Sequence, residues 1–416
     1  MTPKRLSTVI DQISLSDTTQ REGRQSEGVH LSPEASVEHA RLVDRLGIDY
    51  LELNHPASSP TLNKLVKEIS NLGLKKTKVV THVRCNFRDV QTAIETGVQG
   101  INTYIPIKPH SEEAVQSAIK QAIEEDLPKI VELTRKNEVE LRVSVEHALS
   151  LSLKLLTHVY REVSCLDGVH RVGIAETTGV CWPWKLREYA EAIYQVIPEK
   201  TPIQFHMHND HGLVAANFLE ILGLLAKNGR KAVFDISIAG YGERNGILSY
   251  GDVFSILYLL NSKKLKARYN IDKYGDLVRF VEKEIGVPLC RRDPLNPWAF
   301  SHSAAPHLDG MINDSNPYQA ISPEDFGFEL KLNVGHCVTG HEGIKYFAQR
   351  EMGFEIPDEA AKEIAAAIRE YASVNGPLDD KELRAFLSNR AKPLILKKKE
   401  NGQTFRGIKT NSFSKT

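Results

Sequence analysis

The chain has 416 residues, which fits one large barrel of about 250 residues followed by a smaller region. Its 53 lysine and arginine residues balance 53 aspartate and glutamate residues, which argues against a nucleic-acid-binding or membrane-surface protein, since both need a basic excess. Five scattered cysteines without a C-x-x-C pair, together with the lack of a secretory signal or of a long apolar run, favour a cytoplasmic protein.

From the N-terminus onward, short β-rich segments alternate with segments of helical patterning. The expected strands are 12–16, 49–53, 78–82, 100–105, 140–145, 170–174, 202–207 and 233–238. Apolar residues at three- and four-residue spacing predict helices between them, at 33–46, 61–72, 111–136, 149–163, 183–196 and 213–227. Eight strand–helix alternations predict a parallel sheet closed into a (β/α)8 TIM barrel.

This alternation stops after about residue 273. Residues 291–326 are rich in Pro, Asn, Asp and His and are expected to form loops and short helices, whereas 359–387 returns to helical patterning. We therefore expect an α/β chain with a TIM-barrel domain over 1–275 and a smaller, mostly α region behind it. That region divides into a linker subdomain over 276–330, a helical subdomain over 331–391 and a disordered basic tail over 392–416.

Polar residues gather where the expected strands end. They form clusters at 17–22, 52–55, 82–84, 142–146, 176–178, 206–210 and 240–246, with Asn102 on the fourth strand. The carboxyl ends of the strands carry the active site in TIM barrels. The clusters therefore predict an active site at this end, whereas a buried packing layer would be apolar.

The most specific metal-binding pattern is His206-Met207-His208. Residues two apart on a strand point to the same face, so both imidazoles are expected at the barrel mouth. Glu22, beside Arg21 after the first strand, would supply a carboxylate, and two histidines with one carboxylate typically bind a divalent ion. The alternatives are two histidines satisfied on a strand and a surface Arg21–Glu22 pair. The register of eight strands favours the metal site.

Cations and hydroxyls follow strands three, five and six, and they suit a substrate with carboxylates: His82, Arg142, Ser144 and Thr177. Glu146 lies two residues beyond Ser144 and so shares its face. Buried salt bridges are the alternative, and they fit Glu52 or Arg84 equally well. The glycines of 240–246 let the backbone approach a ligand, but no phosphate-binding loop supports nucleotide binding.

These clusters resemble the isopropylmalate and homocitrate synthases, often called the DRE-TIM metallolyase superfamily. Residues 17–25 are similar to its D-T/S-T-L-R-D/E-G-x-Q motif, 206–210 to H-x-H-N-D and 240–246 to G-x-G-E-R-x-G. Residues 300–310, 318–327 and 334–340 resemble its downstream elements. Homocitrate synthase is the most similar branch, because Arg21-Glu22, T-H-x-R-C at 81–85 and G-E-R-N-G-I at 242–247 match it.

The resemblance implies roles for individual residues. The ligands of a zinc, magnesium or manganese ion would be Glu22, His206 and His208. The 2-oxo acid would be held by Gln25, His82, Arg142, Ser144 and Thr177. Arg21 would bind the keto oxygen, and His307, assisted by Glu146, would act as the base, with Tyr318 as a supporting donor. Without the resemblance, His302 and His307 would be assigned a structural role.

The implied activity is a metal-assisted Claisen condensation of acetyl-CoA, the co-substrate, with a 2-oxo dicarboxylic acid. With 2-oxoglutarate, and after hydrolysis of the thioester, it would yield homocitrate and CoA, a step of lysine biosynthesis. The resemblance also implies a homodimer whose C-terminal region reaches the partner's active site. Asn102 stands where homocitrate synthases usually have aspartate, and Pro306 also departs from their pattern, so oxaloacetate, phosphonopyruvate or 2-oxoisovalerate remain alternatives. A hydroxyacyl-CoA lyase and a 2-oxo acid sensor are further alternatives. A sensor is disfavoured because the chain retains the whole set Arg21, Glu22, His206, His208, His307 and Tyr318. A lyase is disfavoured by the histidine-bearing segment beyond the barrel. No nucleic acid or membrane partner is expected.

Overall fold

The computed structural model describes residues 8–107, 111–285, 291–314 and 318–400, with side chains up to residue 390. Two compact units make up the chain. The first, here the barrel unit, comprises Met1–Ala299 and Asp325–Gly327, and the second, here the helical unit, comprises Phe300–Glu324 and Phe328–Thr416. Of the tail expected over 392–416, residues 401–416 lie outside the described ranges, and a helix occupies the preceding residues to Glu400.

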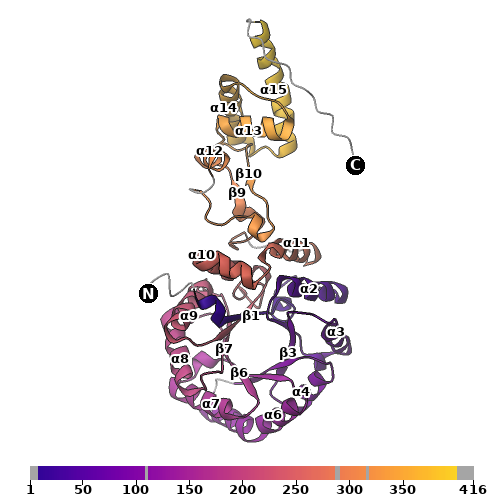
Figure 1. Ribbon diagram of the computed structural model, residues 1–416, viewed down its shortest axis with the longest axis vertical. Coiled ribbons are helices and arrows are strands. Elements are labelled where there is room, and N and C mark those ends of the chain that lie inside the picture. Colours follow the sequence, from indigo (N-terminus) through magenta and orange to yellow (C-terminus); the bar gives the residue numbers. More distant parts are fainter. Residues whose placement is uncertain (1–7, 108–110, 286–290, 315–317, 401–416) are drawn as a thin grey trace. The chain divides into compact units, whose positions relative to one another are not determined.

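Eight parallel strands close into the barrel that the alternation predicts, which confirms the TIM-barrel fold (Figure 1). They follow one another in chain order, and the last pairs with the first, with Ile13 opposite Ala232. The strands are β1 (Ile13–Asp17), β2 (Tyr50–Leu53), β3 (Lys78–Arg84), β4 (Gly100–Ile105), β5 (Glu140–Val145), β6 (Val169–Glu176), β7 (Ile203–Met207) and β8 (Ala232–Ile236).

Helices form a ring outside the strands (Figure 1). They are α2 (Pro33–Leu46), α3 (Pro60–Ser70), α4 (Phe87–Ile94), α5 (Glu112–Gln121), α6 (Leu127–Lys136), α7 (Leu153–Cys165), α8 (Pro183–Val196), α9 (Val214–Asn228), α10 (Tyr250–Arg268) and α11 (Tyr274–Ile285). Several begin at a serine whose side chain accepts a backbone N–H of the first turn, as Ser32 does from Ala35. Gly47 ends α2 in the left-handed conformation that glycine adopts without strain.

The helix expected over 111–136 contains an irregular turn. A π-helical turn, Ala122–Asp126, separates α5 from α6. Pro128 lacks the N–H that would bond to the carbonyl four residues earlier, and its ring crowds that carbonyl, so the helix widens locally. The next helix, α7, begins later than expected, because Ser152 caps its first turn by accepting a bond from the Leu155 N–H.

The helical unit is mostly α, as expected for the C-terminal region. A short parallel pair, β9 (Ser301–His302) with β10 (Lys331–Leu332), accompanies α12 (Ala305–Asn313), α13 (His341–Met352), α14 (Asp358–Asn375) and α15 (Asp380–Glu400). Apolar side chains of the last three helices form its core, among them Ile344, Phe347, Ile364, Ile368 and Leu387. Within the part of the chain that the structure describes, no helix has both the length and the apolar character of a membrane span.

Candidate active site and metal centre

The loop after β1 is held by a buried carboxylate, Asp17. It accepts hydrogen bonds from the Thr19 backbone N–H at 2.9 Å and from the Tyr250 hydroxyl at 2.7 Å. The Glu22 N–H bonds to the Thr18 carbonyl at 2.7 Å, which turns the chain at this point. These bonds fix a tight turn, and the turn directs the side chains of Arg21 and Glu22 toward the barrel mouth.

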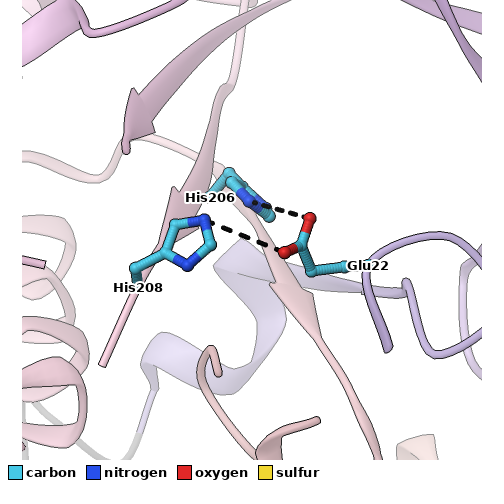
Figure 2. A group of neighbouring side chains, drawn as sticks. All are labelled: Glu22, His206 and His208. Atoms are coloured by element: carbon cyan, nitrogen blue, oxygen red, sulfur yellow. Dashed lines mark ion pairs between the residues drawn. The ribbon is translucent and has the colours of Figure 1, made fainter. Parts of the chain in front are cut away.

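Glu22 meets two histidines at that mouth (Figure 2). Its Oε2 lies 3.6 Å from His206 Nε2, and its Oε1 lies 3.9 Å from His208 Nε2. The three ligand atoms lie within 4.8 Å of one another, as close as atoms sharing one ion must be. His206 is the last residue but one of strand β7, and His208 is the first residue after that strand. Both therefore lie at the barrel mouth, as their two-residue spacing predicts.

The protonation states of this triad suit a divalent cation. Burial raises the pKa of Glu22, but the positive charge of Arg21 acts in the opposite direction and the pKa is lowered to about 2. Burial lowers the pKa of His208 to about 4, so its imidazole is neutral near pH 7. Ionised carboxylate and neutral imidazole are the forms that bind a metal. The donor set therefore fits a divalent ion.

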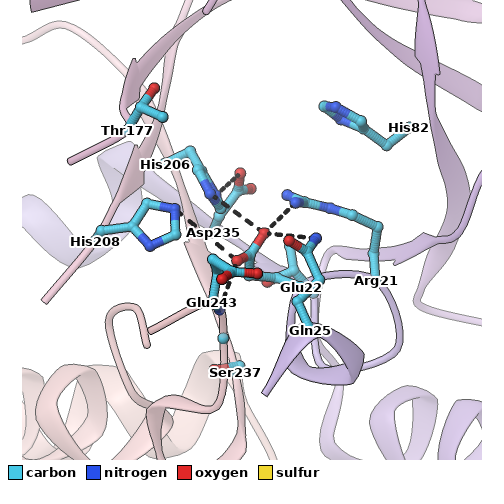
Figure 3. A network of polar contacts seen from close by, with 12 residues as sticks. Arg21, Glu22, Gln25, His82, Thr177, His206, His208, Asp235, Ser237 and Glu243 are labelled. Carbon is cyan, nitrogen blue, oxygen red and sulfur yellow. Dashed lines mark hydrogen bonds and ion pairs between the residues drawn. The ribbon is translucent and has the colours of Figure 1, made fainter. Parts of the chain in front are cut away.

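Arg21 lies between two carboxylates. Its Nε donates to Glu52 Oε1 at 2.6 Å, and its Nη1 donates to Glu22 (Figure 3). Glu52 is fully buried and also accepts a hydrogen bond from the Asn102 amide. It therefore forms a buried salt bridge with Arg21, which is the alternative role that the sequence allowed for Glu52. Burial opposes the charge on Arg21, but Glu52 and Glu22 outweigh that effect and raise its pKa, which keeps the guanidinium charged. Arg84 also forms an ion pair, with Asp89 at 2.6 Å.

A cavity of about 390 Å³ lies over the triad. All ten barrel residues proposed from the sequence line it: Arg21, Glu22, Gln25, His82, Arg142, Ser144, Glu146, Thr177, His206 and His208. In Figure 3, His82 and Thr177 lie on opposite sides of the group around Glu22. Burial lowers the pKa of His82 to about 4, and its ring stacks on Tyr104 with centroids 4.9 Å apart.

Arg142 is buried and has unused hydrogen-bonding capacity. Its Nη2 donates to Ser144 Oγ at 3.3 Å, and its Nη1 lies 3.5 Å from Asp235 Oδ2. Within the described ranges, neither its Nε nor its Nη1 has a hydrogen-bond partner. Gly173 lies beside it, where a Cβ would come within 2.7 Å of Ser144 Cβ. The absence of a side chain there leaves room for Ser144 and for the Arg142 guanidinium, whose Nε would lie 3.3 Å from that Cβ.

The two remaining predicted catalytic residues lie in the helical unit. The rings of His307, on α12, and Tyr318 are 4.9 Å apart, and those of His302 and His307 are 5.8 Å apart. His302 Nε2 is 3.1 Å from Gln319 Oε1. These residues belong to a different unit from the triad.

Two residues of the site received no role from the sequence, although one of them, Arg244, lies within the 240–246 cluster. Asp235, on β8, lies 3.2 Å from His206 Nδ1 (Figure 3). It also accepts a hydrogen bond from Gln204 Nε2 at 2.6 Å. A carboxylate on the far nitrogen of a histidine orients its ring for metal binding. The sequence could have indicated Asp235, because it is the single acidic residue in the mostly apolar segment 233–238 and a buried carboxylate needs a partner. The second residue is Arg244, which bonds Asp210.

Comparisons with known proteins found matches along most of the chain. A family model described as HMGL-like matches residues 12–281, and one described as homocitrate synthase post-HMGL domain-like matches residues 296–376. The cytosolic homocitrate synthase isozyme of Saccharomyces cerevisiae is 29% identical across 94% of this chain and 90% of its own length. The mitochondrial homocitrate synthase of Penicillium rubens is 30% identical across 93% and 81%.

A third relative carries a different name. The (R)-citramalate synthase of Methanocaldococcus jannaschii is 26% identical across 93% of this chain and 76% of its own length. Among solved structures, hydroxymethylglutaryl-CoA lyase from Pseudomonas aeruginosa has a TM-score of 0.55 and 20% identity, covering 68% of this chain and 95% of that one. At this identity the structural likeness supports the barrel fold alone.

Proposed function

The chain belongs to the HMGL-like family, and from that premise we propose that it condenses acetyl-CoA with a 2-oxo dicarboxylic acid. The proposed acid is 2-oxoglutarate. The acetyl methyl carbon forms a bond to its keto carbon, water then hydrolyses the thioester, and the products are homocitrate and free CoA. The second matched domain and the relatives named homocitrate synthase make the chain an acyltransferase-type enzyme. We place the reaction in lysine biosynthesis and in the cytoplasm, one of the two compartments that the names of those relatives give.

The observation that carries the choice of a dicarboxylic acid is Arg142. Its buried guanidinium has two nitrogens without a hydrogen-bond partner among the described residues, and it lines the same cavity as the triad. The Asp235 carboxylate lies 3.5 Å from Nη1 without forming a hydrogen bond to it. A buried cation with incomplete hydrogen bonding is costly, and a carboxylate can accept from two guanidinium nitrogens at once. A substrate with a second carboxylate supplies that anion.

Each residue then has a defined task. A divalent ion held by Glu22, His206 and His208 would polarise the keto group of the acceptor. Arg21, oriented by Glu52, stabilises negative charge that develops on the keto oxygen. The hydroxyls of Ser144 and Thr177 and the side chains of Gln25 and His82 orient the acid.

The helical unit supplies proton transfer in this proposal. His307, assisted by Glu146, removes a proton from the acetyl methyl group, and Tyr318 donates a hydrogen bond. The proposal includes a homodimer in which the helical unit of one copy serves the barrel of the other, as the resemblance to homocitrate synthases implies. The close approach of the His307 and Tyr318 rings supports a joint role.

The test measures free-CoA release by metal-supplemented protein with acetyl-CoA and single 2-oxo acids. Release with 2-oxoglutarate, and its loss in Glu22→Gln, is the expected result. Release with pyruvate, oxaloacetate, phosphonopyruvate or 2-oxoisovalerate alone would reassign the acceptor. Silence across the panel, with metal binding verified, would contradict a condensation and direct the assay to hydroxymethylglutaryl-CoA cleavage.

A further inference from the structure

The guanidinium of Arg244 forms hydrogen bonds to residues of two other loops at the barrel mouth. Arg244 lies in the loop after β8, residues 240–246. Its Nε and Nη2 donate to the two oxygens of Asp210 at 2.6 and 3.0 Å, and its Nη2 also donates to the Thr177 carbonyl at 2.7 Å. Thr177 follows β6, and Asp210 lies two residues beyond His208. Arg244 therefore links an acceptor-binding residue to a metal-binding segment.

The two histidines of the triad are held in different ways. His206 Nδ1 has the Asp235 carboxylate at 3.2 Å, which orients its ring. His208 Nδ1 is buried, and nothing in the described part of the chain bonds to it. The placement of the His208 imidazole therefore depends on its backbone, together with its contacts to the His206 ring and to Glu22.

That backbone is held chiefly by the loop after β8. The His208 N–H bonds to the Glu176 carbonyl at 3.3 Å. The Asn209 N–H donates to the Gly246 carbonyl at 2.9 Å, and the Asn245 amide donates back to the Asn209 carbonyl at 2.8 Å. With the ion pair to Asp210, these bonds place the loop on both sides of the residue that follows His208.

Backbone conformation indicates that this arrangement is strongly determined. Arg244 has φ of 59°, the left-handed region that residues other than glycine rarely adopt, and such strain persists only where the surroundings impose it. Gly179, in the turn after β6, packs so closely that a Cβ there would lie 2.3 Å from Asp210 Oδ2. Asp210, the ion-pair partner of Arg244, thus packs closely against the backbone of the turn after β6.

We propose that Arg244 is a positioning residue that acts through Asp210 on His208, the metal ligand whose Nδ1 has no hydrogen-bond partner among the described residues, and through the carbonyl of Thr177 on the acceptor site. The part that concerns the acceptor rests on the proposed function. The part that concerns metal binding does not, because it follows from the Glu22–His206–His208 geometry.

The first test measures zinc affinity of the full-length protein by competition with a chelator. Arg244→Gln is expected to bind zinc about 10–100-fold more weakly than the wild type, the range seen when an outer partner of a ligand is lost. Arg187→Gln is the matched control, since Arg187 also forms an ion pair, to Glu220 at 2.8 Å, with a side chain 38% exposed against 42% for Arg244. Equal zinc affinity of the Arg244→Gln and Arg187→Gln variants would overturn the proposal.

The second test is kinetic. Arg244→Gln should lower kcat/KM for the 2-oxo acid by roughly 100-fold, because small displacements at a reacting centre have effects of that size, and leave the KM for acetyl-CoA unchanged. Asp210→Asn should act alike, and the double variant should be no worse than the poorer single one, because the two residues work as a unit. Additive losses would contradict a shared role. If the wild type releases no CoA with any acid, the proposed function fails, whereas the zinc comparison still decides the role of Arg244.

Discussion

At the scale of single residues, Arg142 connects the shape of the cavity to the identity of the acceptor. If its open nitrogens bind the distal carboxylate, Arg142→Gln should lower kcat/KM for 2-oxoglutarate about 10–100-fold, the loss expected for a charged hydrogen bond. The value for pyruvate, which has no second carboxylate, should change little. Steady-state kinetics with both acids measures the ratio, and an equal loss for both would contradict carboxylate recognition by Arg142.

Asp293 offers a test of stability that does not involve the cavity. Burial raises its pKa to about 6, above the ordinary value of 3.8, and within the described residues its Oδ2 has no hydrogen-bond partner. Because the pKa of Asp293 is higher in the folded state than in the unfolded state, the protonated carboxyl makes its full contribution to the free energy of unfolding below about pH 4. That contribution is lost as the pH rises through about 6. At about 1.4 kcal/mol per pH unit of pKa difference, the loss is about 3 kcal/mol by pH 7.

The variant Asp293→Asn removes this titration and keeps an oxygen that can accept the Leu295 N–H. Relative to wild type, its free energy of unfolding should therefore improve between about pH 4 and 7. Urea denaturation at several pH values measures the difference. Parallel pH profiles for the two proteins would show that Asp293 does not titrate in this range.

Residue roles differed in how far the sequence could predict them. The spacing of His206 and His208 along one strand is local, so their shared face was predictable. The partners Asp235 and Arg244 were not, because each acts on residues far along the chain: Asp235 contacts His206 29 positions away, and Arg244 bonds the carbonyl of Thr177 67 positions away. Periodicity within a segment contains no information about such contacts.

At the scale of elements, the loop after β8 depends on a glycine at its end. Gly246 has φ of 81°, and a Cβ there would lie 1.9 Å from the Gly240 carbonyl oxygen. Gly246→Ala should therefore destabilise the protein by about 1–3 kcal/mol and reduce zinc affinity, since the loop could not close as it does. Urea denaturation and chelator competition measure the two effects.

Gly223 provides the matched control for that substitution. It lies in α9, and a Cβ there meets nothing within 4 Å. Gly223→Ala should raise stability by up to about 1 kcal/mol, because alanine favours a helix over glycine. Similar stability of the two alanine variants would contradict the role given to the backbone at Gly246.

The order of the elements was predictable because strand and helix periodicities are local and alternate eight times. Their ends were less so. The start of α7 depends on the cap at Ser152, and the π-helical turn before α6 depends on Pro128, whereas apolar spacing alone continues through both places. Propensity and periodicity thus predict the barrel, and specific caps and breaks decide where each helix begins.

At the scale of the whole molecule, the proposed homodimer makes a test possible with two inactive variants. His307→Ala disables the helical unit and Glu22→Gln disables the barrel. If the helical unit serves the partner's barrel, a mixed dimer has one intact site, so an equal mixture with subunit exchange should recover about a quarter of wild-type CoA release. No recovery, with exchange verified by differently tagged copies, would contradict a shared active site.

The measurement that tests the central claim most directly identifies the product. Metal-loaded protein is incubated with 2-oxoglutarate and acetyl-CoA labelled with carbon-13 in the acetyl group, and the reaction is followed by NMR. A condensation predicts free CoA together with a tricarboxylic acid that carries the label in a new carbon–carbon bond, and both should disappear with a chelator or in Glu22→Gln. Labelled acetate with free CoA would show thioester hydrolysis without condensation, and it would contradict the function proposed for this site.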